Sequence, residues 1–286
     1  MAEQHTQPEQ PERPITKAYN NSEFLNSPDA RVIRIMAEYI EPTERFIRHN
    51  VSGAVVFFGS ARIAPPEHTA RTIAAIERQI AQSHGEQREL HLATLDMLRT
   101  KHLMGRYYAD AVELSRLITE WGKQHTPPGS QKRFVVCTGG GPGIMEAANQ
   151  GAHLAGGESI GLNISLPFEQ FPNPYISGTL NFEFHYFFMR KLFFMQLANA
   201  MVIFPGGYGT LDECMELLTL VQTRKVTKNL PIVLYGSDFW DEVINFPRMV
   251  EFGMISPDDL NLFHRSNDVH DAFTYLTESL AKFHQL

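Results

Sequence analysis

Four short apolar stretches constrain the fold of this chain more than any other feature. They occupy residues 54–58, 134–137, 201–204 and 231–235 and consist almost entirely of apolar residues. Segments with helix-favouring sequence separate them. Strands that are apolar on both faces and alternate with helices are typical of an open parallel sheet covered on both sides. The pattern therefore predicts an α/β fold with a Rossmann-like, doubly wound parallel sheet.

The rest of the chain is expected to add elements around this sheet. Prolines among Gln and Glu near the N-terminus predict a disordered tail over residues 1–26, followed by one domain over residues 27–286. That domain carries an N-terminal helical extension and a helical insertion at about 63–105. Gly85 and Gly122 are expected helix breaks. Further strands are expected near 158–164, 180–184 and 261–265. Helices are expected near 27–50, 66–85, 88–125, 144–154, 186–198, 238–252 and 269–284, and from the turn at 205–210 to about residue 224.

Charge and cysteine content exclude several classes of protein. Lys and Arg number 25 against 32 Asp and Glu, a balance that disfavours nucleic acid as a partner. The two cysteines, Cys137 and Cys214, lie too far apart for a zinc or disulfide motif. The 12 histidines show no metal-ligand spacing, so no metal is predicted. With no signal peptide and no apolar run of about 18 residues, we expect a cytoplasmic protein with no membrane partner.

Two glycine-rich turns follow apolar strands and open helices, at residues 139–143 and 205–210. Glycine lets a backbone approach a ligand closely, and the free N–H groups of a helix's first turn attract an anion. Neither turn matches the P-loop or the dinucleotide fingerprint, so a single phosphate is the expected ligand. Alternatively, the glycines only make tight turns, and Thr210 and Glu213 form a capping box.

A third feature is a pair of cations, Arg190 and Lys191, inside the apolar segment 187–195. A charge on a mostly buried helix needs an acidic partner or an anionic ligand. Arg190 is the better candidate for a site, because its guanidinium grips phosphate and carboxylate in a fixed fork. Lys191 is equally compatible with a solvated stripe on the helix.

Four motifs in order resemble the LOG (Lonely Guy) family, including its longer bacterial branch. They read FFGSAR at 57–62, GGGPGIMEAAN at 139–149, MRK at 189–191 and PGGYGTLDE at 205–213. Members of this family are cytokinin riboside 5′-monophosphate phosphoribohydrolases with a Rossmann-like fold. Many such sequences are labelled lysine decarboxylases, although this chain shows no pyridoxal-phosphate signature.

The resemblance implies roles for individual residues. Arg190 and Glu213 match the family's catalytic pair. Glu146 is expected at the ribose hydroxyls or the leaving base, although a carboxylate near a helix N-terminus also has a purely structural explanation. The other positions expected to bind substrate or phosphate are Gly59, Ser60, Gly140, Gly141, Gly143, Met189, Lys191, Gly206, Gly207, Gly209 and Thr210.

The resemblance implies hydrolysis of a purine or cytokinin nucleoside 5′-monophosphate, such as AMP, to free base and ribose 5-phosphate, with no cofactor. It also implies a homodimer or larger homo-oligomer, consistent with the aromatic-rich segment 186–194. The insertion departs from the compact family pattern and leaves the accepted base open. Two alternatives remain: a non-catalytic Rossmann-like protein that binds a nucleotide or phosphorylated cofactor, and a pyridoxal-phosphate decarboxylase.

Overall fold

A computed structural model describes residues 16–166 and 171–286 of the chain. The chain divides into a short unit that ends at Glu41 and a large unit from Pro42 to Leu286. The short unit is helical where it is described, so the predicted tail is wrong for residues 18–26, while residues 1–15 lie outside the described residues. Its elements are η1 (Ala18–Asn20), α1 (Ser22–Asn26), η2 (Pro28–Ala30) and the first part of α2 (Arg31–Arg48).

The large unit is built on a parallel sheet, which confirms the predicted fold class. Within the described residues its seven strands follow the order β4-β3-β2-β1-β5-β6-β7. The chain builds outward from β1 to β4 and then returns to add β5 on the other side of β1, so the order reverses between β1 and β5. In open α/β sheets this switch point is where ligands bind. The strands are β1 (Ala54–Phe58), β2 (Val135–Thr138), β3 (Ser159–Ile164), β4 (Asn181–Phe184), β5 (Ala198–Ile203), β6 (Ile232–Tyr235) and β7 (His264–Ser266).

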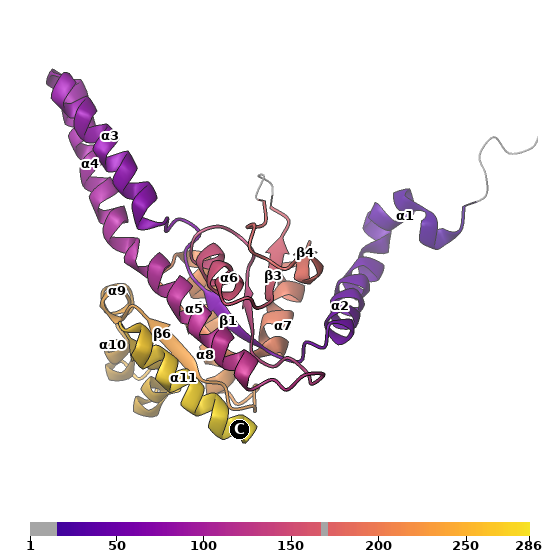
Figure 1. Ribbon diagram of the computed structural model, residues 1–286. Coiled ribbons are helices and arrows are strands. Elements are labelled where there is room, and N and C mark those ends of the chain that lie inside the picture. Colours follow the sequence, from indigo (N-terminus) through magenta and orange to yellow (C-terminus); the bar gives the residue numbers. More distant parts are fainter. Residues whose placement is uncertain (1–15, 167–170) are drawn as a thin grey trace, which may run out of the picture. The chain divides into compact units, whose positions relative to one another are not determined.

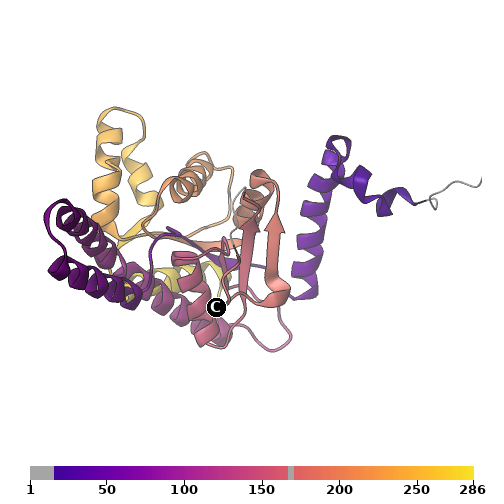
Figure 2. The ribbon, with the colours of Figure 1, turned by 90° about the horizontal axis from the view of Figure 1, so that it is seen from above.

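Helices cover both faces of the sheet (Figures 1 and 2). On one face, α5 (Arg106–Gln124), α6 (Ile144–Leu154) and α11 (Val269–His284) enclose a buried cluster that includes Phe57 of β1. On the other face, Phe58 of β1 packs edge-on against Phe194 of α7 (Phe187–Leu197), with ring centroids 4.8 Å apart. Successive strand residues point to opposite faces, so Phe57 packs into the core on one face of the sheet and Phe58 into the core on the other.

The predicted insertion is a helical hairpin made of α3 (Pro66–Gln82) and α4 (Gly85–Met104), which extends from the body of the unit (Figure 1). Gly85 begins α4 with a φ of +57°, as the predicted break requires. The long helix expected over 88–125 is two helices in the structure, because α4 ends before Gly105 and α5 begins after it. The break predicted at Gly122 is wrong, because this glycine lies inside α5 and packs closely against Phe134.

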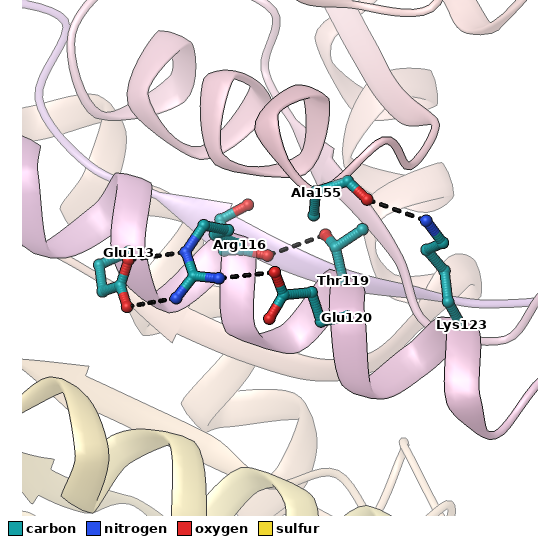
Figure 3. Close-up of polar contacts among 7 residues, drawn as sticks. Glu113, Arg116, Thr119, Glu120, Lys123 and Ala155 are labelled. Atoms are coloured by element: carbon teal, nitrogen blue, oxygen red, sulfur yellow. Dashed lines mark hydrogen bonds and ion pairs between the residues drawn. The ribbon is translucent and has the colours of Figure 1, made fainter.

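Polar side chains on α5 form ion pairs along that helix, and one of them reaches the end of α6 (Figure 3). Arg116 binds Glu113 at 2.7 Å and Glu120 at 2.6 Å along the same helix. Lys123 donates to the carbonyl of Ala155 at 2.9 Å, just after α6 ends. A cation at that position satisfies a carbonyl that the helix leaves free and favours the negative end of its dipole.

The C-terminal part completes the second half of the sheet. The helix expected over 238–252 is two helices, α9 (Ser237–Val243) and α10 (Phe246–Glu251), because Asn245 caps the second of them. Helix α8 (Tyr208–Gln222) connects β5 to β6. None of the described helices combines the length and the apolarity that crossing a membrane requires.

Candidate functional site

Ser60 joins the three turns that leave the carboxyl ends of β1, β2 and β5. Its N–H donates to the carbonyl of Pro205 at 3.0 Å, and its own carbonyl accepts from the N–H of Ile144 at 3.1 Å. Gly59 is equally constrained, since a Cβ there would meet the side chain of Ile144 at 2.6 Å. The structure therefore places the sequence-predicted motifs of β1, β2 and β5 side by side at the switch point of the sheet.

The turn after β2 is held by close packing and internal hydrogen bonds. Gly140 and Gly143 have φ values of +75° and +73°, a region that other residues rarely adopt. A Cβ at Gly143 would lie 2.3 Å from the carbonyl oxygen of Ser60. The amide of Asn173 donates to the carbonyls of Gly140 and Gly141, both at 3.1 Å. This turn is a rigid wall of the candidate site.

The turn after β5 leaves space above its backbone. Helix α8 begins at Tyr208 with Gly207 as its N-cap, so Thr210 stands in the first turn of the helix and the capping-box alternative is wrong. A Cβ at Gly206 would meet the hydroxyl of Thr210 at 2.1 Å. A Cβ at Gly207 or Gly209 would meet no atom of the described chain within 4 Å. The backbone at these two glycines thus borders open space at the N-terminal end of α8, where helices favour a phosphate.

Arg190 and Glu213, the predicted catalytic pair, lie together on adjacent helices. Arg190 stands in the first turn of α7 and Glu213 in the second turn of α8, and their nearest charged atoms are 4.0 Å apart. Both side chains are largely buried, with 15% and 6% exposed. A Cβ at Gly139 would lie 3.9 Å from the guanidinium of Arg190, so the turn after β2 borders the pair.

The pair has unused hydrogen-bonding capacity. Among the described residues, neither Oε2 of Glu213 nor Nε of Arg190 has a hydrogen-bond partner, although both atoms are buried. Buried polar atoms are normally satisfied, and an orphan atom at a site points to a missing ligand or water. Burial raises the pKa of Glu213 to about 7, against the opposing attraction of Lys191 and Arg190. Glu213 therefore exchanges a proton near neutral pH.

Lys191 is held by two carboxylates of α8. Its ammonium lies 2.9 Å from Asp212 and 2.6 Å from Glu216. These ion pairs connect α7 to α8 beside the Arg190–Glu213 pair. The structure thus gives Lys191 acidic partners in place of the solvated position that the sequence left open.

Two further predicted residues lie near the turn after β2 and on α7. Glu146, in the first turn of α6, accepts a hydrogen bond at 3.2 Å from the hydroxyl of Tyr108 on α5, which fixes the carboxylate. Met189 is buried within α7. Sequence analysis missed Tyr108, because it lies in a helix with no motif around it.

A pocket of about 200 Å³ opens beside Gly206. Two predicted residues, Ser60 and Gly206, line it together with six residues that carried no predicted role: Arg62, Ile63, Lys101, Met104, Pro205 and Phe239. Arg62 belongs to a motif and was detectable in the sequence, whereas Lys101 and Met104 come from the insertion. No group of three or more metal-ligating side chains gathers within the described residues.

Comparison with known proteins identifies relatives for the part of the chain that carries these motifs. Residues 145–276 match a family described as possible lysine decarboxylase. A probable cytokinin riboside 5′-monophosphate phosphoribohydrolase of Oryza sativa subsp. japonica is 29% identical over 158 residues, which are 53% of this chain and 57% of the relative. A pyrimidine/purine nucleotide 5′-monophosphate nucleosidase of Escherichia coli (strain K12) is 32% identical over 117 residues, 37% of this chain and 25% of the relative.

Among solved structures, the molybdenum cofactor carrier protein of Chlamydomonas reinhardtii aligns with a TM-score of 0.44 and 18% identity. The alignment covers 80% of this chain and 99% of that chain, but a similarity this weak supports no conclusion about function. The sequence relatives are more informative, although the chain covers less than two thirds of either relative's length. The matches to the family model and to curated phosphoribohydrolases agree with the resemblance to the LOG family that the four motifs indicate.

Proposed function

We propose that the protein hydrolyses the N-glycosidic bond of a nucleoside 5′-monophosphate to the free base and ribose 5-phosphate. The observation that carries the proposal is the buried Arg190–Glu213 pair, with an unpartnered carboxylate oxygen, beside a glycine turn that leaves open space. The activities named for the curated relatives support it. A protein that only binds a nucleotide needs the turn but has no use for the buried pair.

The phosphate would occupy the first turn of α8. Backbone N–H groups at Gly207, Gly209 and Thr210 point along the positive end of the helix dipole, which favours a dianion. The hydroxyl of Thr210, packed against Gly206, adds a donor from the same turn. This arrangement binds phosphate through its geometry, without a lysine of the P-loop type.

Glu213 would act on the ribose. Breaking the glycosidic bond builds positive charge on the sugar, and a carboxylate nearby stabilises that charge. As the water oxygen bonds to C1′, the electron pair of the C1′–N bond leaves with the base, and Glu213 accepts the proton that the water gives up. The departing base nitrogen takes up a proton from solvent and Glu213 returns its proton to solvent, so the neutral base and ribose 5-phosphate are released. A pKa of about 7 suits this exchange near neutral pH. Arg190 would bind both the Glu213 carboxylate and the substrate, and so fix their positions relative to each other.

The test is to incubate the protein with AMP and to quantify adenine and ribose 5-phosphate. We expect Glu213→Gln to lower kcat by about 10²- to 10⁴-fold, the usual worth of a general base. Glu278→Gln is the matched control, since Glu278 is exposed on α11, and it should leave the rate unchanged. A panel of nucleotides that includes isopentenyl-adenosine monophosphate extends the test. If AMP and the other nucleotides bind but none is cleaved, the hydrolase proposal is overturned in favour of a nucleotide-binding protein.

The protein would act as a homodimer or larger homo-oligomer. On α7, Phe187, Phe188 and Leu192 are 51%, 50% and 44% exposed, an unusual density of apolar surface beside the pair. The ring of Phe187 lies 5.2 Å from the guanidinium of Arg190, so a partner covering this face would also shield the site. Sedimentation of the wild type and of Phe188→Asp tests this, and we expect the variant to dissociate. The cytoplasmic location stays a prediction.

A further inference from the structure

The helical insertion contributes to the pocket beside the proposed phosphate turn. Lys101 and Met104, from the last turn of α4, line the pocket together with Pro205 and Gly206 of the turn after β5. Gly206 therefore belongs both to the pocket and to the turn. A nucleotide whose phosphate lies on that turn has another of its groups within reach of the pocket.

The pocket is too small for a whole nucleotide. Its volume of about 200 Å³ lies below the roughly 300 Å³ at which pockets begin to enclose a complete drug-sized ligand. Its walls are mainly apolar, formed by Ile63, Met104 and Phe239. A planar ring fits such walls better than a phosphate does, because a doubly charged group would be desolvated there. The base is the part of a nucleotide that suits this space.

The polar groups of the pocket are donors. Arg62 and Lys101 are exposed at its rim, and neither has an acidic partner within 4 Å in the described parts of the chain. The hydroxyl of Ser60 already accepts the N–H of Arg62 at 3.1 Å, which leaves its hydrogen free to donate. The carbonyl of Pro205 already accepts the N–H of Ser60. No lining side chain is a carboxylate or an amide that would accept from an amino group.

We propose that this pocket receives the base and favours bases whose edge carries an oxygen acceptor over bases that carry an amino group there. Hypoxanthine and guanine present O6 and N7, which pair with Arg or Lys, whereas adenine presents an amino donor at position 6. Uracil and cytosine differ in the same way at position 4. The inference rests on the proposed function and narrows its substrate class to 6-oxopurine and uracil nucleotides.

The experiment compares two matched pairs of substrates, IMP with AMP and UMP with CMP. We expect kcat/KM and affinity by calorimetry to favour IMP and UMP by about tenfold, the usual worth of one well-placed donor at a base edge. Lys101→Met keeps the length of the side chain and removes its donor, so it should reduce both ratios to about threefold or less. Arg88→Met, on the exposed part of the same hairpin, should leave them unchanged.

Outcomes of this experiment separate the two proposals. The base-pocket proposal is overturned if the protein releases the base equally well from both nucleotides of each pair. It is also overturned if Lys101→Met leaves the IMP/AMP and UMP/CMP ratios unchanged. Either result leaves the hydrolase proposal standing. Preferential binding of IMP without any base release would overturn the hydrolase and leave the pocket. Tighter binding of ADP than of AMP, lost in Lys101→Met, would show that the pocket takes a second phosphate, and would also overturn the base assignment.

Discussion

In the turn after β2, Gly140 and Gly143 adopt positive φ, and a methyl group at either position would collide with neighbouring atoms. In the turn after β5, Gly207 and Gly209 lack positive φ, and a methyl group would meet no atom of the described chain within 4 Å. The two sequences look alike, yet folding requires the first pair of glycines, whereas no contact within the described chain requires the second pair. Glycine content alone therefore does not locate a binding site.

The largest effect that tests this contrast is on folding. Gly143→Ala would place a methyl group 2.3 Å from the carbonyl oxygen of Ser60, in a backbone conformation that alanine disfavours. We expect it to lower the free energy of unfolding by about 3 kcal/mol or more, since strain and overpacking add. Urea denaturation measures this. A variant as stable as the wild type would show that the two turns do not differ.

The Arg190–Glu213 pair, beside the turn after β5, should lower the stability of the folded protein at high pH. Because the pKa of Glu213 is raised to about 7, the folded protein keeps a proton that the unfolded chain loses above its ordinary value of 4.5. Stability contributed by the neutral carboxyl is present at pH 4 and is lost as the pH rises through 7. Glu213→Gln, which mimics the neutral form, should therefore be more stable than wild type by about 3 kcal/mol at pH 8. Thermal unfolding at pH 4 and pH 8 measures the difference, and a gain independent of pH would contradict it.

The hydrogen bonds that fix the first turn should matter less than its glycines. Asn173 is buried and donates to two carbonyls of the turn and to Oδ1 of Asn149 at 2.9 Å. Asn173→Ala removes all three bonds and leaves the carbonyl of Gly141 without this donor, while the carbonyl of Gly140 keeps the N–H of residue 173 and Oδ1 of Asn149 keeps the hydroxyl of Thr138. The variant should lose about 2 kcal/mol of unfolding free energy. Nucleotide affinity should change little once the variant is folded. Calorimetry on the folded fraction checks this, and a large loss of affinity with unchanged stability would reverse the roles of the turns.

The smallest expected effect is at the turn after β5, where a substitution of glycine should raise, and not lower, the free energy of unfolding. Gly209→Ala lies in the first turn of α8, where alanine favours the helix by about 0.5–1 kcal/mol. The methyl group enters the space proposed for the phosphate, so AMP should bind about tenfold more weakly, or about 1.4 kcal/mol. Unaltered affinity would mean that the phosphate lies elsewhere.

Much of the sheet could be predicted because its strands are apolar on both faces. The apolar stretches 54–58 and 201–204 predict central parallel strands. The structure has β1 at the first stretch, and β5 covers most of the second. Helix boundaries were harder to predict. Gly122 has the composition of a break, but its lack of a side chain serves close packing against Phe134 within α5. The interruption at Gly105 coincides with the end of the predicted insertion, and a Cβ there would lie 3.3 Å from Pro66 at the start of α3.

The sequence by itself determined the fold class and the motifs, including Arg190 and Glu213, because apolar periodicity and glycine-rich turns are local properties of the chain. Tertiary structure decided which glycines leave space, that two carboxylates hold Lys191, and that the insertion lines a pocket at the phosphate turn. These features depend on distances between atoms from different elements. Lys101 and Gly206 are more than a hundred residues apart, and only the folded sheet brings both of them to one pocket.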